Sequence, residues 1–182
     1  AAKEFERDGG TVFYATADVA DRTALLAAIT KAEAALGPID GLFANAGIGG
    51  EFAPFTDCSD ENWDNIIATN LTGVFTAMRR VLPGMIELGR GSMVLTGSLA
   101  SERGMENNPA YVASKHAVLG LARAAALENA AHNIRVNCVL PGLIETPLLH
   151  NIGGDDIPAA MAAMGKNIPL GHVGTAEETA EV

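Results

Sequence analysis

Cysteine is scarce in this sequence. Cys58 and Cys138 are the only two among 182 residues, and neither stands at metal-ligand spacing from the other or from a histidine. The four histidines are scattered, with no HxH or HExxH pattern (His116, His132, His150 and His172). The sequence therefore predicts no metal site and no disulfide framework, and its cysteine usage fits a reducing, cytoplasmic compartment.

Long hydrophobic runs and an excess of basic residues are also missing. No stretch approaches the ~18–20 consecutive apolar residues that a membrane helix needs, and the first eight residues are too polar for a signal peptide. Lys and Arg number 12 against 22 Asp and Glu, which gives a net charge of −10 at pH 7. Because nucleic-acid binding needs a basic face that neutralises phosphates, we expect neither a nucleic-acid partner nor a membrane partner.

What the sequence does contain is a regular alternation of short β-rich runs and longer helical stretches. We expect four strands (Thr11–Thr16, Ile39–Ala44, Gly91–Thr96 and Ile134–Leu140). We expect helices at about residues 23–36, 61–88, 109–131 and 155–166, and a final one that Thr175 caps. Pro83 is expected to kink or split the second of these helices. The alternation predicts one α/β domain over residues 1–182, with a parallel sheet covered by helices on both faces.

The sequence also gives an expectation about its own ends. Residues 1–7 have the pattern of the end of a helix, and the chain stops inside another helical pattern. No Gly-rich turn of the G-x-G-x-x-G type precedes Thr11, although a dinucleotide site needs such a turn to hold the pyrophosphate. We therefore expect the native polypeptide to be longer at both ends.

Tyr111 and Lys115 form the pair with the clearest chemical purpose. Their i, i+4 spacing places a phenol and an ammonium on one face of a helix. A free tyrosine has a pKa of about 10, and a nearby cation favours its ionised form, so the pair can provide a base. Ser98 follows the expected strand at residues 91–96, at the end where α/β sheets bind ligands. Its hydroxyl can therefore reach a substrate oxygen, although an ordinary loop serine is the simpler interpretation.

These residues occur in the order and spacing of the short-chain dehydrogenase/reductase family. Over essentially all of its length the chain resembles the classical type of this family. The motifs that carry the resemblance follow one another along the chain (Asn45-Ala46-Gly47, Asn70, Ser98, Tyr-x-x-x-Lys at 111–115, and Pro141-Gly142-x-x-x-Thr146). Ala44 departs from the family loop, which often reads Asn-Asn-Ala-Gly. The resemblance implies a Rossmann-like, doubly wound parallel sheet in a three-layer α/β/α arrangement.

The resemblance also implies four catalytic residues. Tyr111 would be the acid/base that exchanges a proton with the substrate hydroxyl or carbonyl. Lys115 would favour the phenolate and hydrogen-bond the nicotinamide ribose. Ser98 would hold the substrate oxygen, and the main chain at Asn70 would support a water that leads protons outward from Lys115.

A cofactor site is implied in the same way, with NAD or NADP as the cofactor. Besides Tyr111 and Lys115, it would use a pair at the adenine ring, a loop under the adenosine ribose, and a turn at the nicotinamide carboxamide (Asp18 and Val19; Asn45, Ala46 and Gly47; Pro141, Gly142, Ile144 and Thr146). The sequence does not choose between NAD and NADP, because it lacks the acidic or basic residue that separates them in this family.

The expected function is interconversion of a small secondary alcohol and a ketone by hydride transfer. Two alternatives stay open. A 3-oxoacyl thioester reductase would use the same four residues, but the few basic residues offer little surface for a carrier protein. A non-catalytic binding or scaffold subunit would be signalled by loss of Ser98, Tyr111 or Lys115, and all three are present. The resemblance further implies a homotetramer in which the helices that contain Asn70 and Tyr111 pair with their copies.

Overall fold

The computed structural model describes residues 9–150 and 156–181 of the chain. Within these residues, three parallel strands form one sheet in the order β1-β2-β3 (β1, Gly41–Ala44; β2, Gly91–Thr96; β3, Ile134–Val139). The sequence predicts β2 to the residue, whereas its predicted strands at 39–44 and 134–140 are slightly longer than β1 and β3. The parallel sheet that the alternation of elements predicts is therefore present.

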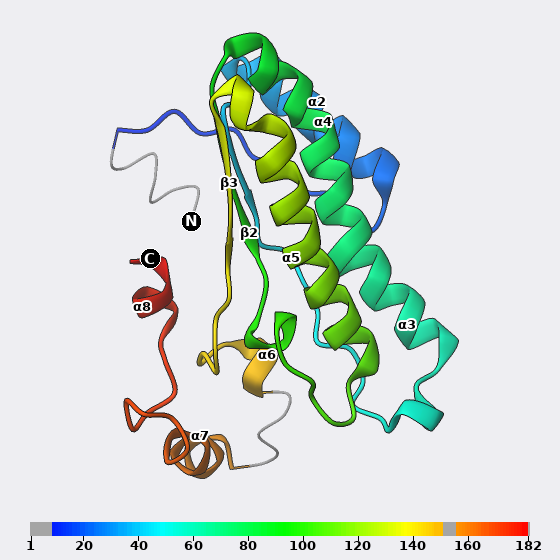
Figure 1. The fold of residues 1–182 in the computed structure, drawn as a ribbon, viewed down its shortest axis with the longest axis vertical. Coiled ribbons are helices and arrows are strands. Elements are labelled where there is room, and N and C mark those ends of the chain that lie inside the picture. The colour runs from blue at the N-terminus through cyan, green and yellow to red at the C-terminus, as the bar shows by residue number, and fades with distance from the viewer. Residues whose placement is uncertain (1–8, 151–155, 182) are drawn as a thin grey trace.

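The helices that connect the strands cover one face of the sheet. β1 is joined to β2 through α3 (Asp60–Ile67) and α4 (Gly73–Leu88), and β2 is joined to β3 through α5 (Pro109–Asn129). Parallel crossovers are right-handed, and both connections step in the same direction across the sheet, so their helices belong on the same face. Figure 1 shows α4 and α5 side by side there, with α2 (Arg22–Leu36) next to α4.

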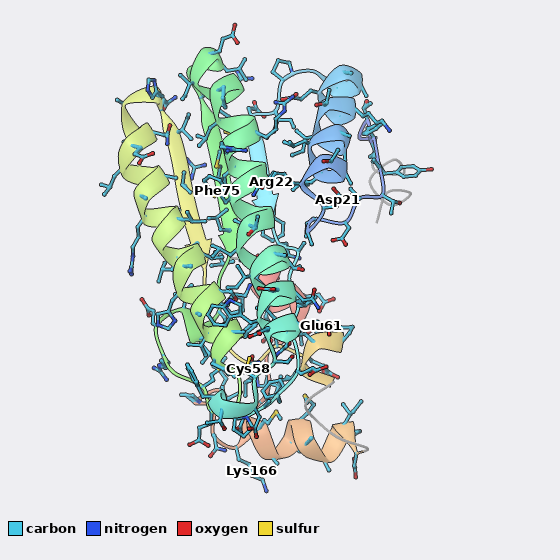
Figure 2. The ribbon with its side chains drawn as sticks, turned by 90° about the vertical axis from the view of Figure 1, so that its right-hand side faces the viewer. Asp21, Arg22, Cys58, Glu61, Phe75 and Lys166 are labelled. Atoms are coloured by element: carbon cyan, nitrogen blue, oxygen red, sulfur yellow. The ribbon has the colours of Figure 1, made fainter. Side chains whose placement is uncertain are left out.

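Helix α2 has local signals at both ends. Asp21 is its N-cap residue, and its carboxylate accepts two amide hydrogens from the first turn. Figure 2 shows Asp21 and Arg22 at this start of the helix. Gly37 ends α2 with a φ of +89°, a conformation that favours glycine. On its side, Glu33 forms an ion pair with Arg80 of α4, which joins the two helices.

The core lies between the sheet and the helices α4 and α5. Met93 and Leu95 of β2 alternate with less buried neighbours, and Ile134 and Val136 do the same in β3, as expected for strands with one covered face. They pack with apolar side chains of both helices (Val74, Met78, Val81, Met85, Val118, Ala122 and Ala125). Burying one such large side chain contributes about 1.5–3 kcal/mol. The core therefore holds α5 against the sheet, and α5 and the sheet carry the residues of the site described below.

The segment predicted as one helix from 61 to 88 is interrupted, but not at Pro83. Ser59 caps it through a hydrogen bond from the Asn62 amide, and α3 then gives way to a π-helical turn, η2 (Ala68–Thr72), before α4 continues to Leu88. Of the predicted kink or split at Pro83, the split is therefore wrong, because α4 continues through that residue. Turns of this kind insert an extra residue into a helix and are frequent at functional sites. Here the turn contains Asn70.

The predicted strand at Thr11–Thr16 is also wrong. Residues 11–18 belong to no strand or helix in the described part of the chain, and the Tyr14 side chain is 77% exposed. A β-rich run becomes a strand only where a neighbour supplies hydrogen bonds. In the described sheet β2 already has β1 and β3 as neighbours, and the segment at 11–16 pairs with neither edge.

The described residues after β3 form three short helices, α6 (Pro147–His150), α7 (Ile157–Gly165) and α8 (Ala176–Ala180). Helix α7 begins after its cap Asp156, and the predicted capping of α8 by Thr175 is confirmed by a capping box with Glu178. The expected helix end at residues 1–7 lies outside the described residues. Among the described helices, none combines the length and hydropathy that crossing a membrane requires.

Candidate active site

The site is built on the segments that leave the carboxyl ends of the three strands. Asn45 follows β1, Ser98 comes shortly after β2, and Pro141 comes shortly after β3. Hydrogen bonds join these segments: Thr96 Oγ1 donates to Asn45 Oδ1 at 2.9 Å, and the Leu99 amide donates to the Pro141 carbonyl oxygen at 2.9 Å. Parallel strands present their carboxyl ends at one edge, so motifs far apart in the sequence meet there.

Tyr111 and Lys115 lie one turn apart in the first half of α5. The Lys115 Nζ atom is 5.7 Å from the centre of the Tyr111 ring, within the range of a cation–π contact. Lys115 Nζ also donates a hydrogen bond of 2.8 Å to the main-chain carbonyl oxygen of Thr96. Tyr111 is half-buried, whereas Lys115 is only 5% exposed. The phenol and the ammonium therefore lie together at the end of β2.

Burial changes the proton affinity of Lys115. Desolvation lowers the pKa of its ammonium from 10.5 to about 8, and the Cys138 thiol nearby opposes this shift by a smaller amount. An ammonium with this pKa is mostly charged at neutral pH and loses its charge in mildly alkaline solution. Lys115 thus supplies a positive charge beside Tyr111 under physiological conditions.

Ser98 stands between β2 and the short 3-10 helix η3 (Leu99–Ser101), and it is buried. Its Oγ atom accepts the Ala100 amide hydrogen at 3.1 Å, and its own amide donates to Ser101 Oγ at 3.1 Å. A serine hydroxyl has one hydrogen to give and two lone pairs. With the Ala100 amide on one lone pair, the Ser98 hydroxyl keeps its hydrogen for an acceptor such as a substrate oxygen.

Asn70 is fully buried in η2 and holds the loop after β1. Its Oδ1 atom accepts the Ile48 amide hydrogen at 2.8 Å, and its Nδ2 atom donates to the Ile48 carbonyl oxygen at 2.9 Å. The same Nδ2 atom donates to Ser114 Oγ at 3.2 Å, and Ser114 Oγ in turn donates to the Tyr111 carbonyl oxygen at 2.8 Å. Through these side-chain contacts, Asn70 connects the loop with the helix that carries Tyr111.

Two further buried asparagines hold the same loop, and the sequence did not identify either as a site residue. Asn62 Oδ1 accepts the Glu51 amide hydrogen at 2.9 Å, and Asn62 Nδ2 donates to the Glu51 carbonyl oxygen at 3.2 Å. Asn108 Nδ2 donates to the Gly49 carbonyl oxygen at 3.0 Å. An asparagine amide can pair with a peptide group as another peptide would. Only the spatial arrangement reveals this role, since no local pattern links Gly49 with a residue 59 positions away.

The loop at residues 45–47 approaches the buried ammonium closely. A Cβ atom built on Gly47 would lie 3.3 Å from Asn70 Oδ1 and 3.6 Å from Lys115 Nζ. The structure thus brings the loop that the resemblance assigns to the adenosine ribose next to the lysine that it assigns to the nicotinamide ribose. Asn45, Ala46 and Gly47 are exposed. This arrangement of an open glycine loop and a buried donor fits a nicotinamide dinucleotide.

The other residues expected at the cofactor lie in two separate places. Asp18 Oδ1 accepts the Ala20 amide hydrogen at 2.9 Å. Val19 packs against α4, where a Cβ atom on Gly73 would come within 2.9 Å of the Val19 carbonyl oxygen. The contacts described for this pair involve α2 and α4 and not Tyr111, as suits a pair assigned to the adenine end of a dinucleotide.

The turn after β3 is held by the segment before α8. Pro141 and Gly142 begin it, and Ile144 forms a β-bridge with Gly174. Thr146 Oγ1 donates to the Ile144 carbonyl oxygen at 3.3 Å, and the Thr146 carbonyl oxygen accepts an amide hydrogen from α6. The residues expected at the nicotinamide carboxamide thus belong to one ordered turn.

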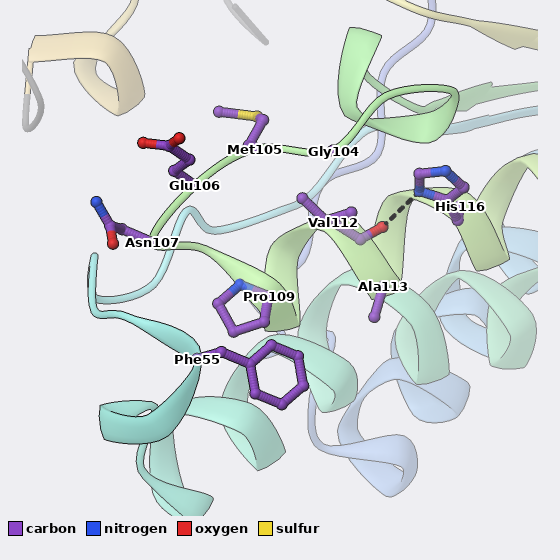
Figure 3. A pocket seen from close by; sticks show the side chains of 9 residues that line it. All are labelled: Phe55, Gly104, Met105, Glu106, Asn107, Pro109, Val112, Ala113 and His116. Carbon is purple, nitrogen blue, oxygen red and sulfur yellow. Dashed lines mark hydrogen bonds between the residues drawn. The ribbon is translucent and has the colours of Figure 1, made fainter.

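A hydrophobic cavity lies on a different face of α5. Its volume is about 500 Å³, and residues from η1 (Phe55–Asp57), the loop before α5 and α5 itself line it, as Figure 3 shows (Phe55, Gly104, Met105, Glu106, Asn107, Pro109, Val112, Ala113 and His116). Among the described residues, this lining contains none of the four expected catalytic ones. Most of its side chains are apolar, so the cavity is an open hydrophobic surface beside the site.

Comparison with known proteins finds relatives of the whole chain. The family described as Enoyl-(Acyl carrier protein) reductase matches residues 1–182. The inactive 2-(S)-hydroxypropyl-CoM dehydrogenase 2 of Xanthobacter autotrophicus is 40% identical to this chain, over 95% of the chain and 76% of its own length. The chain spans between about half and three quarters of the length of such curated relatives.

Solved structures show the same fold. A crystal structure of levodione reductase superposes with a TM-score of 0.91 at 34% identity, over 97% of this chain and 71% of the other. A gluconate 5-dehydrogenase of Burkholderia cenocepacia in complex with NADP and tartrate superposes with a TM-score of 0.89 at 32% identity, over 99% of this chain and 69% of the other. These matches confirm the predicted Rossmann-like, doubly wound α/β fold.

Proposed function

The chain belongs to the short-chain dehydrogenase/reductase family, and we propose that it interconverts a secondary alcohol and a ketone with NAD(H) or NADP(H). The observation that carries the proposal is the buried Lys115 ammonium, 5.7 Å from the Tyr111 ring and hydrogen-bonded to the end of β2. A buried charge is costly unless it is paired or hydrogen-bonded, and a cation beside a phenol favours the phenolate that a base requires.

Each of the three polar side chains has its own part in the proton chemistry. Tyr111 takes a proton from the alcohol oxygen at its phenolate oxygen and returns it in the reverse reaction. Lys115 stabilises that phenolate by its charge. Ser98 donates its hydroxyl hydrogen to the substrate oxygen and holds it in place while charge develops there, as a preorganised donor does. The tie between Asn70 and the Ile48 main chain keeps the loop beside Lys115 in position.

The cofactor supplies the hydride acceptor or donor when it is bound. Asp18 and Val19 would hold its adenine end, the loop at residues 45–47 its adenosine ribose, and the turn at residues 141–146 its carboxamide, with Pro141, Gly142, Ile144 and Thr146 in that turn. Relatives of known structure hold NADP in one case and NAD⁺ in another. Both cofactors therefore remain part of the proposal, and so does the cytoplasmic location expected from the sequence.

The two alternatives keep specific support. A reductase of acyl thioesters is favoured by the family description, which names an acyl carrier protein. A non-catalytic role is favoured by the relative whose name calls it inactive. This chain has 12 basic residues in all, which argues against the first alternative. It also places Ser98, Lys115 and Tyr111 at one edge of the sheet, which argues against the second.

We also propose a symmetric homo-oligomer, expected to be a homotetramer, in which α5 packs against its copy. Leu127 on α5 is 83% exposed. Gly120 lies midway between Leu127 and Ala113, and a Cβ atom there would meet nothing within 4 Å, so another helix can approach closely. In an antiparallel pair with its two-fold axis at Gly120, Leu127 of one copy would lie against Ala113 of the other, which lines the hydrophobic cavity of Figure 3.

An enzyme assay tests the proposed reaction. The full-length protein is mixed with a series of linear and cyclic secondary alcohols and either NAD⁺ or NADP⁺, and the absorbance of the reduced nicotinamide is followed. We expect turnover with at least one alcohol, in a manner that depends on Tyr111. Turnover of 3-oxoacyl thioesters but of no simple ketone would instead support the first alternative, and cofactor binding without any turnover would support the second.

A further inference from the structure

Ser101 occupies a position between two of the expected catalytic residues. It ends η3, three residues after Ser98, and its side chain is 2% exposed. Its Oγ atom accepts the Ser98 amide hydrogen at 3.1 Å and donates its own hydrogen to the Lys115 carbonyl oxygen at 2.8 Å. One small side chain therefore joins the turn that carries Ser98 to the helix that carries Tyr111 and Lys115.

The two hydrogen bonds fix the direction of the Ser101 hydroxyl. A serine hydroxyl has a single hydrogen, which the Lys115 carbonyl oxygen takes, and the Ser98 amide occupies a lone pair. The surroundings leave little room for another arrangement, since a Cβ atom on Gly97 would lie 2.9 Å from Ser101 Oγ and 3.0 Å from Cys138 Sγ. The Ser98 amide is thus oriented by the Ser101 hydroxyl, which is itself hydrogen-bonded to α5.

The main-chain hydrogen bonds that leave the turn reach a different element. The Gly97 amide donates to the Val139 carbonyl oxygen at 2.9 Å, and the Leu99 amide donates to the Pro141 carbonyl oxygen at 2.9 Å. These two bonds hold the turn on β3 and the segment after it. Among the hydrogen bonds described for η3 and for Ser98, the one from Ser101 is the link to α5.

We propose that Ser101 is a positioning residue that sets Ser98 relative to the Tyr111–Lys115 turn of α5. The proposal rests on the proposed function, since it assigns Ser101 an effect on catalysis that acts through Ser98. Misplacement of a catalytic group by about 1 Å can cost up to ~10²-fold in rate. Ser101 donates to the main-chain oxygen of Lys115, and Lys115 Nζ keeps its own hydrogen bond to Thr96. Loss of the Ser101 hydroxyl should therefore lower kcat and leave cofactor binding nearly unchanged.

Kinetics of the full-length enzyme provide the first test. Ser101→Ala should lower kcat for alcohol oxidation by about 10- to 100-fold, with the KM for the cofactor changed by less than about two-fold. If Ser101 acts through Ser98, then Ser101→Ala should have no further effect on kcat in a Ser98→Ala background. A multiplicative loss in the double variant would show a general structural role and would overturn the proposal, as would an unchanged kcat in Ser101→Ala.

A matched control removes a different buried hydroxyl. Thr76 on α4 is 1% exposed, and its Oγ1 atom has no hydrogen-bond partner in the described part of the chain. Thr76→Val removes that hydroxyl at nearly constant volume, so kcat and both KM values should stay as in the wild type. A decrease in kcat equal to that of Ser101→Ala would show that kcat responds to the loss of any buried hydroxyl, and the positioning role would be wrong.

Hydrogen exchange tests the same contact without activity. In the wild type, the Ser98 amide should exchange about as slowly as the core amides of α5, because Ser101 Oγ accepts it in a buried site. Exchange of that amide at the rate of an open loop overturns the proposal, even if Ser101→Ala does not fold. The experiments also distinguish failure of the proposed role of Ser101 from failure of the proposed function. A wild type that reduces no cofactor but protects the Ser98 amide argues against the proposed function alone, because the contact is then present without the reaction.

Discussion

The Lys115 ammonium lies over the face of the Tyr111 ring, 5.7 Å from its centre, while it donates a hydrogen bond to the Thr96 carbonyl oxygen at the end of β2. The ammonium is thereby held from both sides, by an element of the sheet and by the helix on which it stands. This geometry places the phenol of Tyr111 directly beside the Lys115 ammonium. The first two predictions test the two members of this pair.

Tyr111→Phe should abolish most of the activity of the full-length protein. The change removes the phenolic oxygen and retains the ring that packs beside Lys115. We expect kcat for alcohol oxidation to fall by about 10²–10⁴-fold, the range of general acid–base catalysis. The cofactor Kd, measured by fluorescence titration, should change little.

Tyr14→Phe is the matched control for that experiment. Tyr14 is the other of the two tyrosines in the chain and is 77% exposed, so its hydroxyl should be dispensable. Turnover of Tyr111→Phe close to the wild-type value would show that a different group exchanges the substrate proton.

Lys115→Met should make the stability of the fold depend less on pH. Burial lowers the pKa of Lys115 to about 8, whereas an unfolded chain keeps the ordinary value of 10.5. Between pH 8 and 10.5 the unfolded state therefore binds more protons, and the stability of the wild type rises with pH through this window. Below pH 8 the full penalty of burying the charge is present, on the order of 3 kcal/mol.

Unfolding in urea at pH 7, 9 and 10 checks this effect. At pH 7, Lys115→Met should be at least as stable as the wild type, because the removed penalty exceeds the ~1 kcal/mol of a lost hydrogen bond. The difference between the two proteins should then move in favour of the wild type as the pH rises. A difference that stays constant from pH 7 to 10 is incompatible with the lowered pKa.

Lys115→Arg should be less active than the wild type although arginine keeps the positive charge. Lys115 is 5% exposed, and its ammonium fits between the Tyr111 ring and the Thr96 carbonyl oxygen. A planar guanidinium is larger and presents its donors in a fixed fork. We expect kcat to decrease at least about ten-fold and the cofactor KM to rise; wild-type values of both in a steady-state assay would count against a close-fitting ammonium.

Asn62→Ala should loosen the loop after β1. The change removes the hydrogen bonds of the Asn62 side chain to the amide and the carbonyl of Glu51, each of which contributes about 0.5–1.5 kcal/mol. We expect a lower free energy of unfolding and a higher KM for the cofactor. Asn65→Ala, on the same helix but exposed, is the control and should stay within ~0.5 kcal/mol of the wild type. Equal effects of the two variants would refute a special role for Asn62.

Leu127→Asp should disrupt the proposed pairing of α5 with its copy. Replacing this exposed leucine should have little effect on a monomer. In the proposed oligomer, however, the new carboxylate would lie in an apolar cavity of the partner, which would be strongly unfavourable. We expect a smaller molar mass in light scattering at micromolar concentration. Leu170→Asp, at a position that is 74% exposed, should keep the wild-type mass. If the wild type itself is a monomer, the oligomer proposal is wrong.

The chemistry of the site could be anticipated wherever it depends on spacing along the chain. Tyr111 and Lys115 are four residues apart on a helix, and helix geometry alone places them on one face. Ser98 was found because it follows an apolar run that has to be a buried strand, and β2 begins and ends where the sequence predicts. Likewise Thr175 marks the start of α8 through local hydrogen bonds. Each of these features is decided by groups within a few residues of one another.

Other features were decided by contacts that the sequence does not reveal. Thr11–Thr16 has the composition of a strand, but it forms none in the described structure, because a strand exists only beside a neighbour. Asn62 and Asn108 support the loop after β1 through hydrogen bonds to main-chain groups that lie 11 and 59 positions away along the chain. Ser101 resembles any loop serine until its hydroxyl is seen between Ser98 and Lys115. The sequence determined the elements and the catalytic spacing through local geometry, whereas the tertiary structure decided which buried polar groups meet, because hydrogen-bond partners are selected in space and not along the chain.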